Sequence, residues 1–316
     1  MKALWLCILL CVCAGAVFVG STDITHFRSD EVQRHILLNM RMPRVVFAAI
    51  TGAMLGLSGS IYQLVLRNPL ADSFTTGAAS SAALGAVAAI ALGLPAHLAS
   101  PVALFTGLGG LMLVYGVSYR RSGISPVTMI LAGVVLNIVA SSVIGFVKFF
   151  FEESLTSIVF WLMGGFYMIT WTKTAFAAAV FCLCAGYFLL RAKPLNILAL
   201  DEMSAETSGV NVRSERMRAF VFSTALVAVS VSFTGLIGFV GLIVPHIARS
   251  FYGSDVRQGI FYSSVFGALL MITADAVARS VIPNGAELPV GIVTAVLGGV
   301  FFLYILRGRQ AEMWHD

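Results

Sequence analysis

The sequence predicts an all-α polytopic membrane protein with about ten transmembrane helices, folded as a single domain over residues 1–316. Hydrophobic residues make up 59% of the chain and charged residues 11%, whereas about a quarter of the residues in a soluble domain are charged. The mean hydropathy is +0.93. In addition, 30 glycines suit the close packing of helices in lipid.

The apolar runs have the length that a membrane requires, since about 20 helical residues cross a bilayer core of about 30 Å. Dividing the chain at its polar breaks predicts ten spans, at residues 3–20, 45–66, 76–94, 101–119, 127–147, 174–190, 219–237, 239–252, 260–279 and 289–306. The first could be read as a signal peptide. However, its apolar run is long for one and lacks a good small-x-small site, which favours a transmembrane helix. The eighth is short and contains Pro245, which predicts a broken or tilted helix.

The longest polar interruption, residues 194–218, separates six spans in residues 1–190 from four spans in residues 219–316. Within it, residues 195–208 predict one or two short amphipathic helices, and Gly209 is well placed to end them. The expected apolar side consists of Leu195, Leu198, Met203 and Ala205. Short helices at a membrane surface suit docking to another protein, and an ordinary solvated loop is the alternative.

The distribution of basic residues predicts the orientation of the chain. Ten spans place both termini on one side of the membrane, and the loops of that side hold 13 of the 20 lysines and arginines. The positive-inside rule therefore assigns the termini and residues 191–218 to the cytoplasm.

Three arginines gather at one mouth on the opposite side, against this rule. Arg41, Arg44 and Arg279 would form a platform for an acidic partner, because the guanidinium fork pairs bidentately with carboxylates. Alternatively, Arg41 and Arg44 reach lipid phosphates, and Arg279 pairs with Asp275 one helical turn earlier.

Several kinds of chemistry are missing from the sequence. There is no His-Glu-x-x-His motif, no Gly-x-Ser-x-Gly motif and no phosphate-binding loop. The five cysteines lack zinc-site spacing. We therefore expect no catalytic residue, no metal site and no cofactor, and the basic loops of a membrane protein explain the charge of +5 without nucleic acid. No convincing ionisable residue lies at the middle of a span, where an ion-driven transporter needs one. A transporter of this kind depends on a partner for energy.

The chain resembles the permease subunits of the iron–siderophore, haem and cobalamin class of ATP-binding-cassette importers. The resemblance covers about residues 41–307 and rests on nine pieces in the order of the family. They are Arg41-Met-Pro-Arg44, Gly56-Leu-Ser-Gly59, Arg67-Asn-Pro-Leu-Ala-Asp72, Leu131-Ala-Gly133, Trp161-Leu-Met-Gly164, Leu198-Ala-Leu200 through Gly209-Val-Asn-Val212, Gly238-Phe-Val-Gly241 with Val244-Pro-His-Ile-Ala-Arg249, Ala274-Asp275 to Arg279, and Glu287-Leu-Pro-Val-Gly291.

The resemblance implies a type II importer permease fold in a bacterial cytoplasmic (inner) membrane, with both termini cytoplasmic. The implied partners are two cytoplasmic ATP-binding-cassette ATPases, an extracytoplasmic substrate-binding protein and a second permease subunit. That subunit is expected to be an identical copy, with a paralogue as the alternative. The binding protein could be periplasmic or anchored to lipid.

The resemblance also implies three groups of site residues. Docking of the binding protein would use Arg41, Arg44 and Arg279. ATPase coupling would use Leu200, Glu202, Ala205 and Gly209, although Ser208 and Glu206 depart from the usual leucine and basic residue of the family. The cytoplasmic gate would include Asn68, Leu70, Ser125 and Pro126.

The expected function is therefore translocation of an iron chelate, a siderophore complex or haem, driven by a separate ATPase subunit. Cobalamin is the alternative cargo within the same family. An ion-coupled secondary transporter and a membrane subunit without a pathway are the alternatives outside it.

Overall fold

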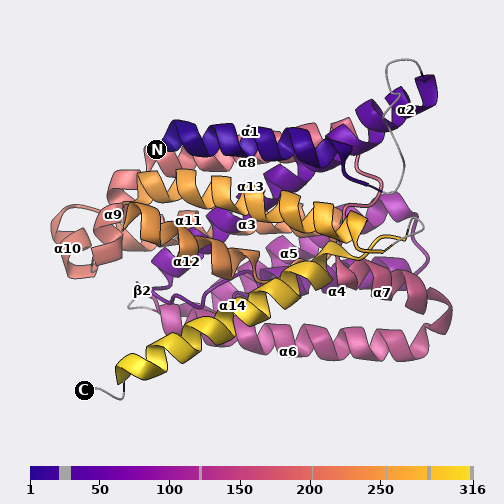
Figure 1. The fold of residues 1–316 in the computed structure, drawn as a ribbon. Helices are drawn as coiled ribbons and strands as arrows, with labels where there is room; N and C mark the ends of the chain where they lie inside the picture. The colour runs from indigo at the N-terminus through magenta and orange to yellow at the C-terminus, as the bar shows by residue number, and fades with distance from the viewer. Residues whose placement is uncertain (21–29, 121–122, 201, 254, 283–285, 314–316) are drawn as a thin grey trace.

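The computed structural model describes residues 1–20, 30–120, 123–200, 202–253, 255–282 and 286–313. These residues form fourteen α-helices and one short antiparallel β-ladder (Figure 1). The elements are α1 (Lys2–Phe18), α2 (Glu31–His35), a π-helical segment η1 (Ile36–Arg41), α3 (Met42–Val65), α4 (Ala78–Ala91), α5 (Ala96–Ser118), β1 (Tyr119–Arg120), β2 (Gly123–Ile124), α6 (Pro126–Phe150), a 3-10 turn η2 (Glu152–Ser154), α7 (Leu155–Met163), α8 (Trp171–Leu190), α9 (Ala192–Leu200), α10 (Glu202–Thr207), α11 (Val212–Thr234), α12 (Val240–Tyr252), α13 (Val256–Ser280) and α14 (Val290–Met313).

Each of the ten predicted spans is a helix, namely α1, α3, α4, α5, α6, α8, α11, α12, α13 and α14. Six helical stretches of the described chain are long and apolar enough to cross a membrane, and α1, α4 and α14 add shorter apolar helices. The start of α1 and the end of α14 lie at the same end of the bundle as α9 and α10 (Figure 1). The chain is thus an all-α, multi-pass membrane protein, as predicted.

Helix α3 is central because it packs against α8, α11, α12 and α13. One very close contact joins Gly52 to Gly267 on α13, where a Cβ atom on either glycine would overlap the carbonyl oxygen of the other. Gly56 approaches the Ser263 carbonyl on the same helix. These glycines line one face of α3 and bring the two backbones into contact.

Helix α12 is unbroken although Pro245 lies in its interior, so of the two expectations, a broken or a tilted helix, the broken one was wrong. Proline has no N–H for the carbonyl four residues earlier, which belongs to Gly241. Gln63 on α3 donates from Nε2 to that carbonyl oxygen at 3.3 Å. Gly59 permits this approach, because a Cβ atom there would overlap the backbone of Gly241.

A second proline at the start of α3 is accommodated in a similar way. Pro43 follows η1, the π-helical segment, and leaves the carbonyl of Leu38, five residues earlier, without a backbone partner. Trp171 on α8 donates from Nε1 to that oxygen at 3.0 Å. The contact fixes the entry to α3 against the first turn of α8.

The polar interruption forms the two short helices α9 and α10, as predicted. Leu195, Leu198 and Ala205 are buried on the expected apolar side, but Met203 is 77% exposed, so its place on that side was wrong. Gly209 has a φ of +75°, the conformation that ends many helices. The N–H of Gly209 donates to the Glu206 carbonyl at 3.0 Å and that of Val210 to Ala205 at 2.9 Å.

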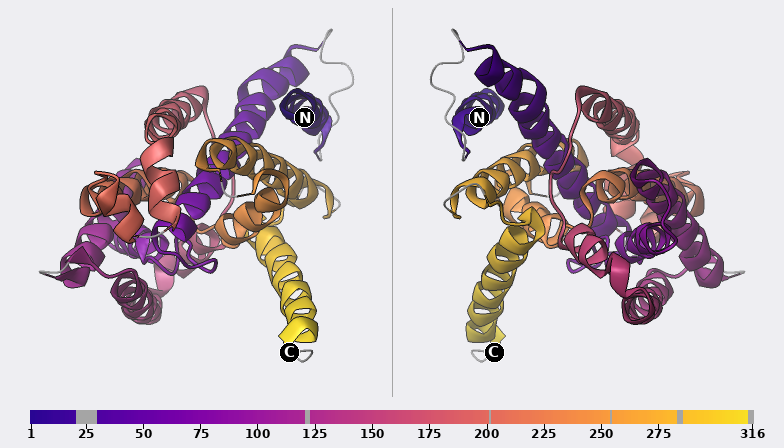
Figure 2. Two further views of the ribbon diagram at one scale, coloured as in Figure 1. Left: turned by 90° about the vertical axis from the view of Figure 1, so that its left-hand side faces the viewer. Right: turned by 90° about the vertical axis from the view of Figure 1, so that its right-hand side faces the viewer.

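Helices α6 and α14 are among those whose apolar side chains this chain leaves uncovered. In Figure 2, α14 projects from the bundle, and α6 lies along one edge in Figure 1. The exposed side chains include Val127, Leu131, Val135 and Ile138 on α6, and Val296, Val300, Leu303 and Tyr304 on α14. Lipid or another membrane subunit is the environment that such faces suit.

Candidate functional site

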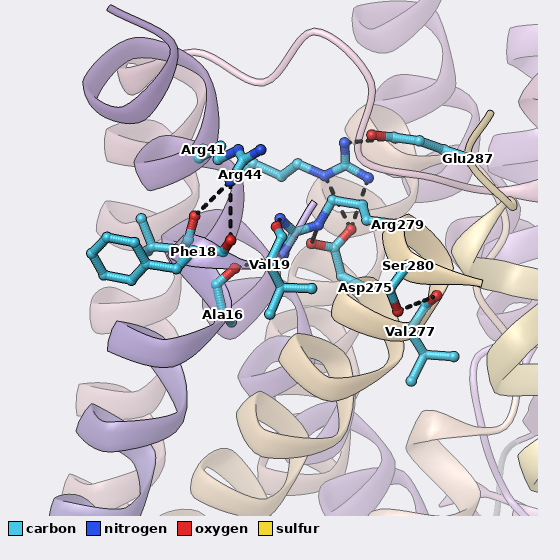
Figure 3. A network of polar contacts seen from close by, with 11 residues as sticks. Ala16, Phe18, Val19, Arg41, Arg44, Asp275, Val277, Arg279, Ser280 and Glu287 are labelled. Carbon is cyan, nitrogen blue, oxygen red and sulfur yellow. Dashed lines mark hydrogen bonds and ion pairs between the residues drawn. The ribbon is translucent and has the colours of Figure 1, made fainter. Parts of the chain in front are cut away.

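Arg44 lies in the first turn of α3, at the opposite end of that helix from Arg67 and α9, and it pairs with two carboxylates (Figure 3). Its Nε and Nη2 atoms lie 3.0 and 2.9 Å from Asp275 Oδ1 on α13. Its Nη1 atom lies 2.7 Å from Oε2 of Glu287, in the segment before α14. Arg44 therefore joins three parts of the chain through charge-assisted hydrogen bonds.

Arg279 lies on the same helix as Asp275 and forms an ion pair with it, Nε to Oδ2, at 3.0 Å. The alternative interpretation of the sequence, an Arg279–Asp275 pair one turn apart, is therefore confirmed as a contact. The guanidinium also donates to the carbonyl oxygens of Val19 and Ala16, the latter at 3.1 Å. Arg279 thus connects α13 to the end of α1 (Figure 3).

Arg41 binds the same end of α1. Its Nη1 atom donates to the carbonyl oxygens of Phe18 and Val17 at 3.2 and 3.4 Å. The last carbonyls of a helix have no partner within the helix and carry a partial negative charge. Arg41 and Arg279 supply donors and positive charge at that point, so together they cap α1.

The structure brings all three predicted docking arginines together, but it uses most of their donors inside the chain. Arg41 is 7% exposed, the Arg279 side chain 3% and the Arg44 side chain 14%. We call these three arginines, together with Asp275 and Glu287, the arginine cluster. Its net formal charge is +1. The charge pattern of the sequence did not indicate that Glu287 or the α1 carbonyls are partners of these arginines.

The predicted coupling residues lie at the other end of the bundle, on and after α9 and α10. Leu200 is 76% exposed, and Gly209 is also exposed. Ala205 is buried on the inner side of α10. It therefore packs against the rest of the protein and does not contribute to the exposed surface of that helix. The side chain of Glu202 lies outside the part of the chain that the structure describes.

Helix α9 and its flanking residues contact three neighbouring helices. Arg67, after α3, donates from Nη2 to the Leu198 carbonyl at 3.1 Å. Asn196 donates to the Asp255 carboxylate at 3.1 Å and accepts from the N–H of Val256 at 2.8 Å, at the start of α13. The bond from Asn196 lowers the pKa of Asp255 below its usual value.

The residue between α8 and α9, Arg191, makes the contact of this region with α11. Arg191 follows α8, and its Nε atom lies 3.1 Å from Oε2 of Glu215, which is buried near the start of α11. Arg218 pairs with the same carboxylate at 3.6 Å. Polar contacts therefore tie α9 and the loop residues around it to α3, α11 and α13.

Both predicted gate turns are held by side-chain caps. After α3, Arg67 has a φ of +49°, and Asn68 Oδ1 accepts from the N–H of Leu70 at 2.8 Å, an Asx turn. Leu70 is 55% exposed. At the start of α6, Ser125 Oγ accepts from Thr128 N–H at 3.4 Å, and Pro126 is the first helical residue.

One cavity, with a volume of about 970 Å³, lies among α5, α7, α8 and α11. Its lining includes the aromatic side chains of Phe160, Trp161, Tyr167, Phe176 and Phe233, and Lys173 adds a cation. Among the described residues, no three His, Cys, Asp or Glu side chains are grouped as metal ligands. The cavity could hold an apolar or aromatic molecule.

Comparison with known proteins identifies the family. The model of the FecCD transport family matches residues 3–308. The molybdate import system permease protein MolB of Haemophilus influenzae is 35% identical over 294 residues, covering 91% of this chain and 87% of MolB. The hemin transport system permease protein HmuU of Yersinia pestis is 33% identical over 303 residues, covering 94% of this chain and 90% of HmuU.

The cobalamin import system permease protein BtuC of Halobacterium salinarum is 35% identical over 287 residues, covering 90% of this chain and 77% of BtuC. Among solved structures, one described as an inward-facing conformation of a metal-chelate type ABC transporter superposes with a TM-score of 0.89 at 32% identity. That match covers 97% of this chain and 98% of the other. The chain therefore belongs to the FecCD transport family and is a permease of an ATP-binding-cassette importer.

Proposed function

We propose that this permease moves an iron chelate, either a ferric siderophore or haem, across the cytoplasmic membrane of a bacterium. The observation that carries the proposal is the near full-length structural match to a metal-chelate type transporter. The hemin permease among the relatives supports the same cargo. Such a cargo brings its own ligands for iron, so its permease needs no fixed metal-binding side chains.

Energy would come from two ATPase subunits that bind the surface of α9 and α10 on the cytoplasmic side. Leu200 and Met203 project from these helices and would enter a groove of the ATPase, with Glu202 and Gly209 beside them. Exposed apolar anchors of this kind are typical of protein interfaces. ATP hydrolysis then belongs to the partner chain, and the permease changes conformation in response.

The gate would open when movement of α9 reaches the turn at Asn68 and Leu70. Arg67 is in direct contact with α9 through the Leu198 carbonyl, which gives the movement a path to α3. The turn at Ser125 and Pro126 would complete the gate. The uncovered apolar faces of α6 and α14 suit a second copy of this permease, with the cargo pathway between the two copies.

A binding protein outside the membrane would deliver the chelate by placing its carboxylates against the arginine cluster. Arg44 is the most accessible arginine of the cluster, and incoming carboxylates would compete with Glu287 for its Nη1 atom. Arg41 and Arg279 are buried, so they would add positive charge without touching the binding protein. Docking would therefore depend on salt concentration, as expected for a rim of opposite charges.

A transport assay over several cargoes tests the proposed substrate. Cells that lack this permease would be supplied with haem, a ferric siderophore, cobalamin or molybdate, with and without the restored gene. We expect restoration to recover accumulation of an iron chelate and of neither other cargo. Recovery of cobalamin or molybdate alone would overturn the iron assignment, and molybdate is included because MolB is among the relatives.

A further inference from the structure

A second cavity lies apart from the sites described above, in a groove among α1, α3, α8 and α13. Its volume is about 500 Å³. The walls are almost entirely apolar and include Leu9 on α1, Ala53 on α3, Phe181 on α8, and Ile260 and Ala268 on α13. Helix α1 lies at the periphery of the molecule in Figure 2, so the groove is on the outside of the bundle.

Two cations line the same groove. Lys2 is the first residue of α1 and Arg257 the second residue of α13. Both side chains are exposed, and the Lys2 ammonium lies 5.4 Å from the centre of the Phe261 ring. Both helices begin at this end of the groove, so their N-terminal N–H groups add to the positive potential.

The described lining contains no carboxylate. Asp255 caps α13 just outside this lining and accepts from the Arg257 N–H at 3.0 Å. That carboxylate is also bonded to Asn196 on the side of α9. Asp255 also interacts electrostatically with Arg257, but the described lining itself adds no negative charge to offset Lys2.

The groove persists because α1 is anchored elsewhere. The arginine cluster holds the far end of α1, and Trp5 packs edge-to-face on Phe266, with ring centres 4.7 Å apart. These contacts fix α1 against α13 without filling the space between α1 and α8. An apolar groove at a lipid-facing surface is accessible to acyl chains.

The chemistry of the walls selects among possible occupants. A peptide segment would bring backbone N–H and C=O groups that need partners in an apolar environment. The wall offers little for them, because Ser264 donates its hydroxyl to the Ile260 carbonyl of its own helix at 2.7 Å. A hydrocarbon chain needs no such partners.

We propose that this groove binds one anionic phospholipid, with its phosphate between Lys2 and Arg257 and an acyl chain along α3 and α13. Basic residues at the membrane surface attract anionic headgroups, and the apolar walls accept the chain. The bound lipid would fill the space beneath the first half of α1 and hold that helix to the bundle. The proposal does not depend on which cargo is transported.

Lipid binding by the full-length protein in mild detergent tests the proposal. Delipidated protein would be titrated with phosphatidylglycerol or phosphatidylcholine, and bound lipid would be counted by native mass spectrometry. We expect one tightly bound phosphatidylglycerol, retained several-fold better than phosphatidylcholine. Equal retention of the two lipids by the unchanged protein would overturn the proposal.

Three variants locate the binding site. The double variant Lys2→Gln/Arg257→Gln should lose the preference for phosphatidylglycerol, and Ser264→Leu should reduce binding of both lipids by filling the groove. The control Arg307→Gln removes an exposed cation of α14 that is not among the groove residues, and it should behave like the unchanged protein. An equal loss in the control, or full binding by both groove variants, would contradict the assignment.

Discussion

Arg67 donates a hydrogen bond from Nη2 to the backbone carbonyl of Leu198 at 3.1 Å, which joins the turn after α3 to α9. We therefore predict that Arg67→Ala slows cargo uptake by roughly fivefold or more, since coupling between two sites is typically worth 1–3 kcal/mol. ATP hydrolysis by the assembled transporter should continue. The control Lys193→Ala removes an exposed cation from α9 itself. Uptake at the normal rate by Arg67→Ala would show that this contact carries no movement to the gate.

Replacing the shared carboxylate of the arginine cluster should destabilise the fold. Asp275→Asn leaves Arg279 buried without its ion pair and weakens the bonds to Arg44. Removing one partner of a buried pair costs about 3–5 kcal/mol, so the midpoint of thermal unfolding in detergent should fall clearly. Glu31→Gln breaks an exposed pair with Arg34 and should leave the midpoint nearly unchanged. Matching midpoints for the two variants would contradict a structural role for the cluster.

The contact between Gly52 and Gly267 predicts a position-specific cost of one methyl group. Gly52→Ala places a Cβ atom against the Gly267 carbonyl, and such overpacking costs about 1–3 kcal/mol. Gly186→Ala is the matched control, because a Cβ atom there meets nothing within 4 Å. The control should be neutral or stabilising, since alanine is the better helix former. Unfolding measured for both variants compares them directly, and equal stability would mean that the two helices do not pack this closely.

The surface of α9 and α10 should be needed for ATPase binding. Leu200→Ser removes an exposed apolar anchor, so less ATPase should copurify with the permease while the permease itself remains folded. Leu190→Ser changes another exposed leucine, at the end of α8, and should have no such effect. Normal recovery of the ATPase with Leu200→Ser would place the interface elsewhere.

Docking of the binding protein should respond to Arg44 more than to its buried neighbours. Arg44→Gln removes the most accessible positive charge of the cluster, so the binding protein should associate more slowly and with a weaker dependence on salt. Association rates at several salt concentrations measure this effect, with the melting midpoint as a check on folding. An unchanged rate in a folded Arg44→Gln protein would rule out docking through this residue.

The sequence predicted the helices well because apolar length is a strong signal, and each of the ten predicted spans is a helix. It failed where tertiary contacts decide the outcome. Pro245 does not break α12, because Gln63, far away in the chain, donates to the carbonyl that proline leaves unpaired. The prediction also missed helix α7, which lies between two predicted spans. With 9 residues it is shorter than the length that crosses a membrane.

The candidate site was predictable in composition but not in geometry. The charge rule and the family motifs both indicated Arg41, Arg44 and Arg279. Neither could show that Arg41 and Arg279 cap α1, because those contacts join residues more than 20 and 250 positions apart. Likewise, amphipathic spacing placed Met203 with Leu198, whereas the break between α9 and α10 turns Met203 outward.

Uptake by reconstituted vesicles tests the central claim most directly. The permease would be incorporated into proteoliposomes with its ATPase, and a loaded binding protein would be added outside. We predict that ATP inside the vesicles drives accumulation of an iron chelate, and that an ion gradient without ATP does not. Accumulation by the permease alone, driven by an ion gradient, would contradict the account.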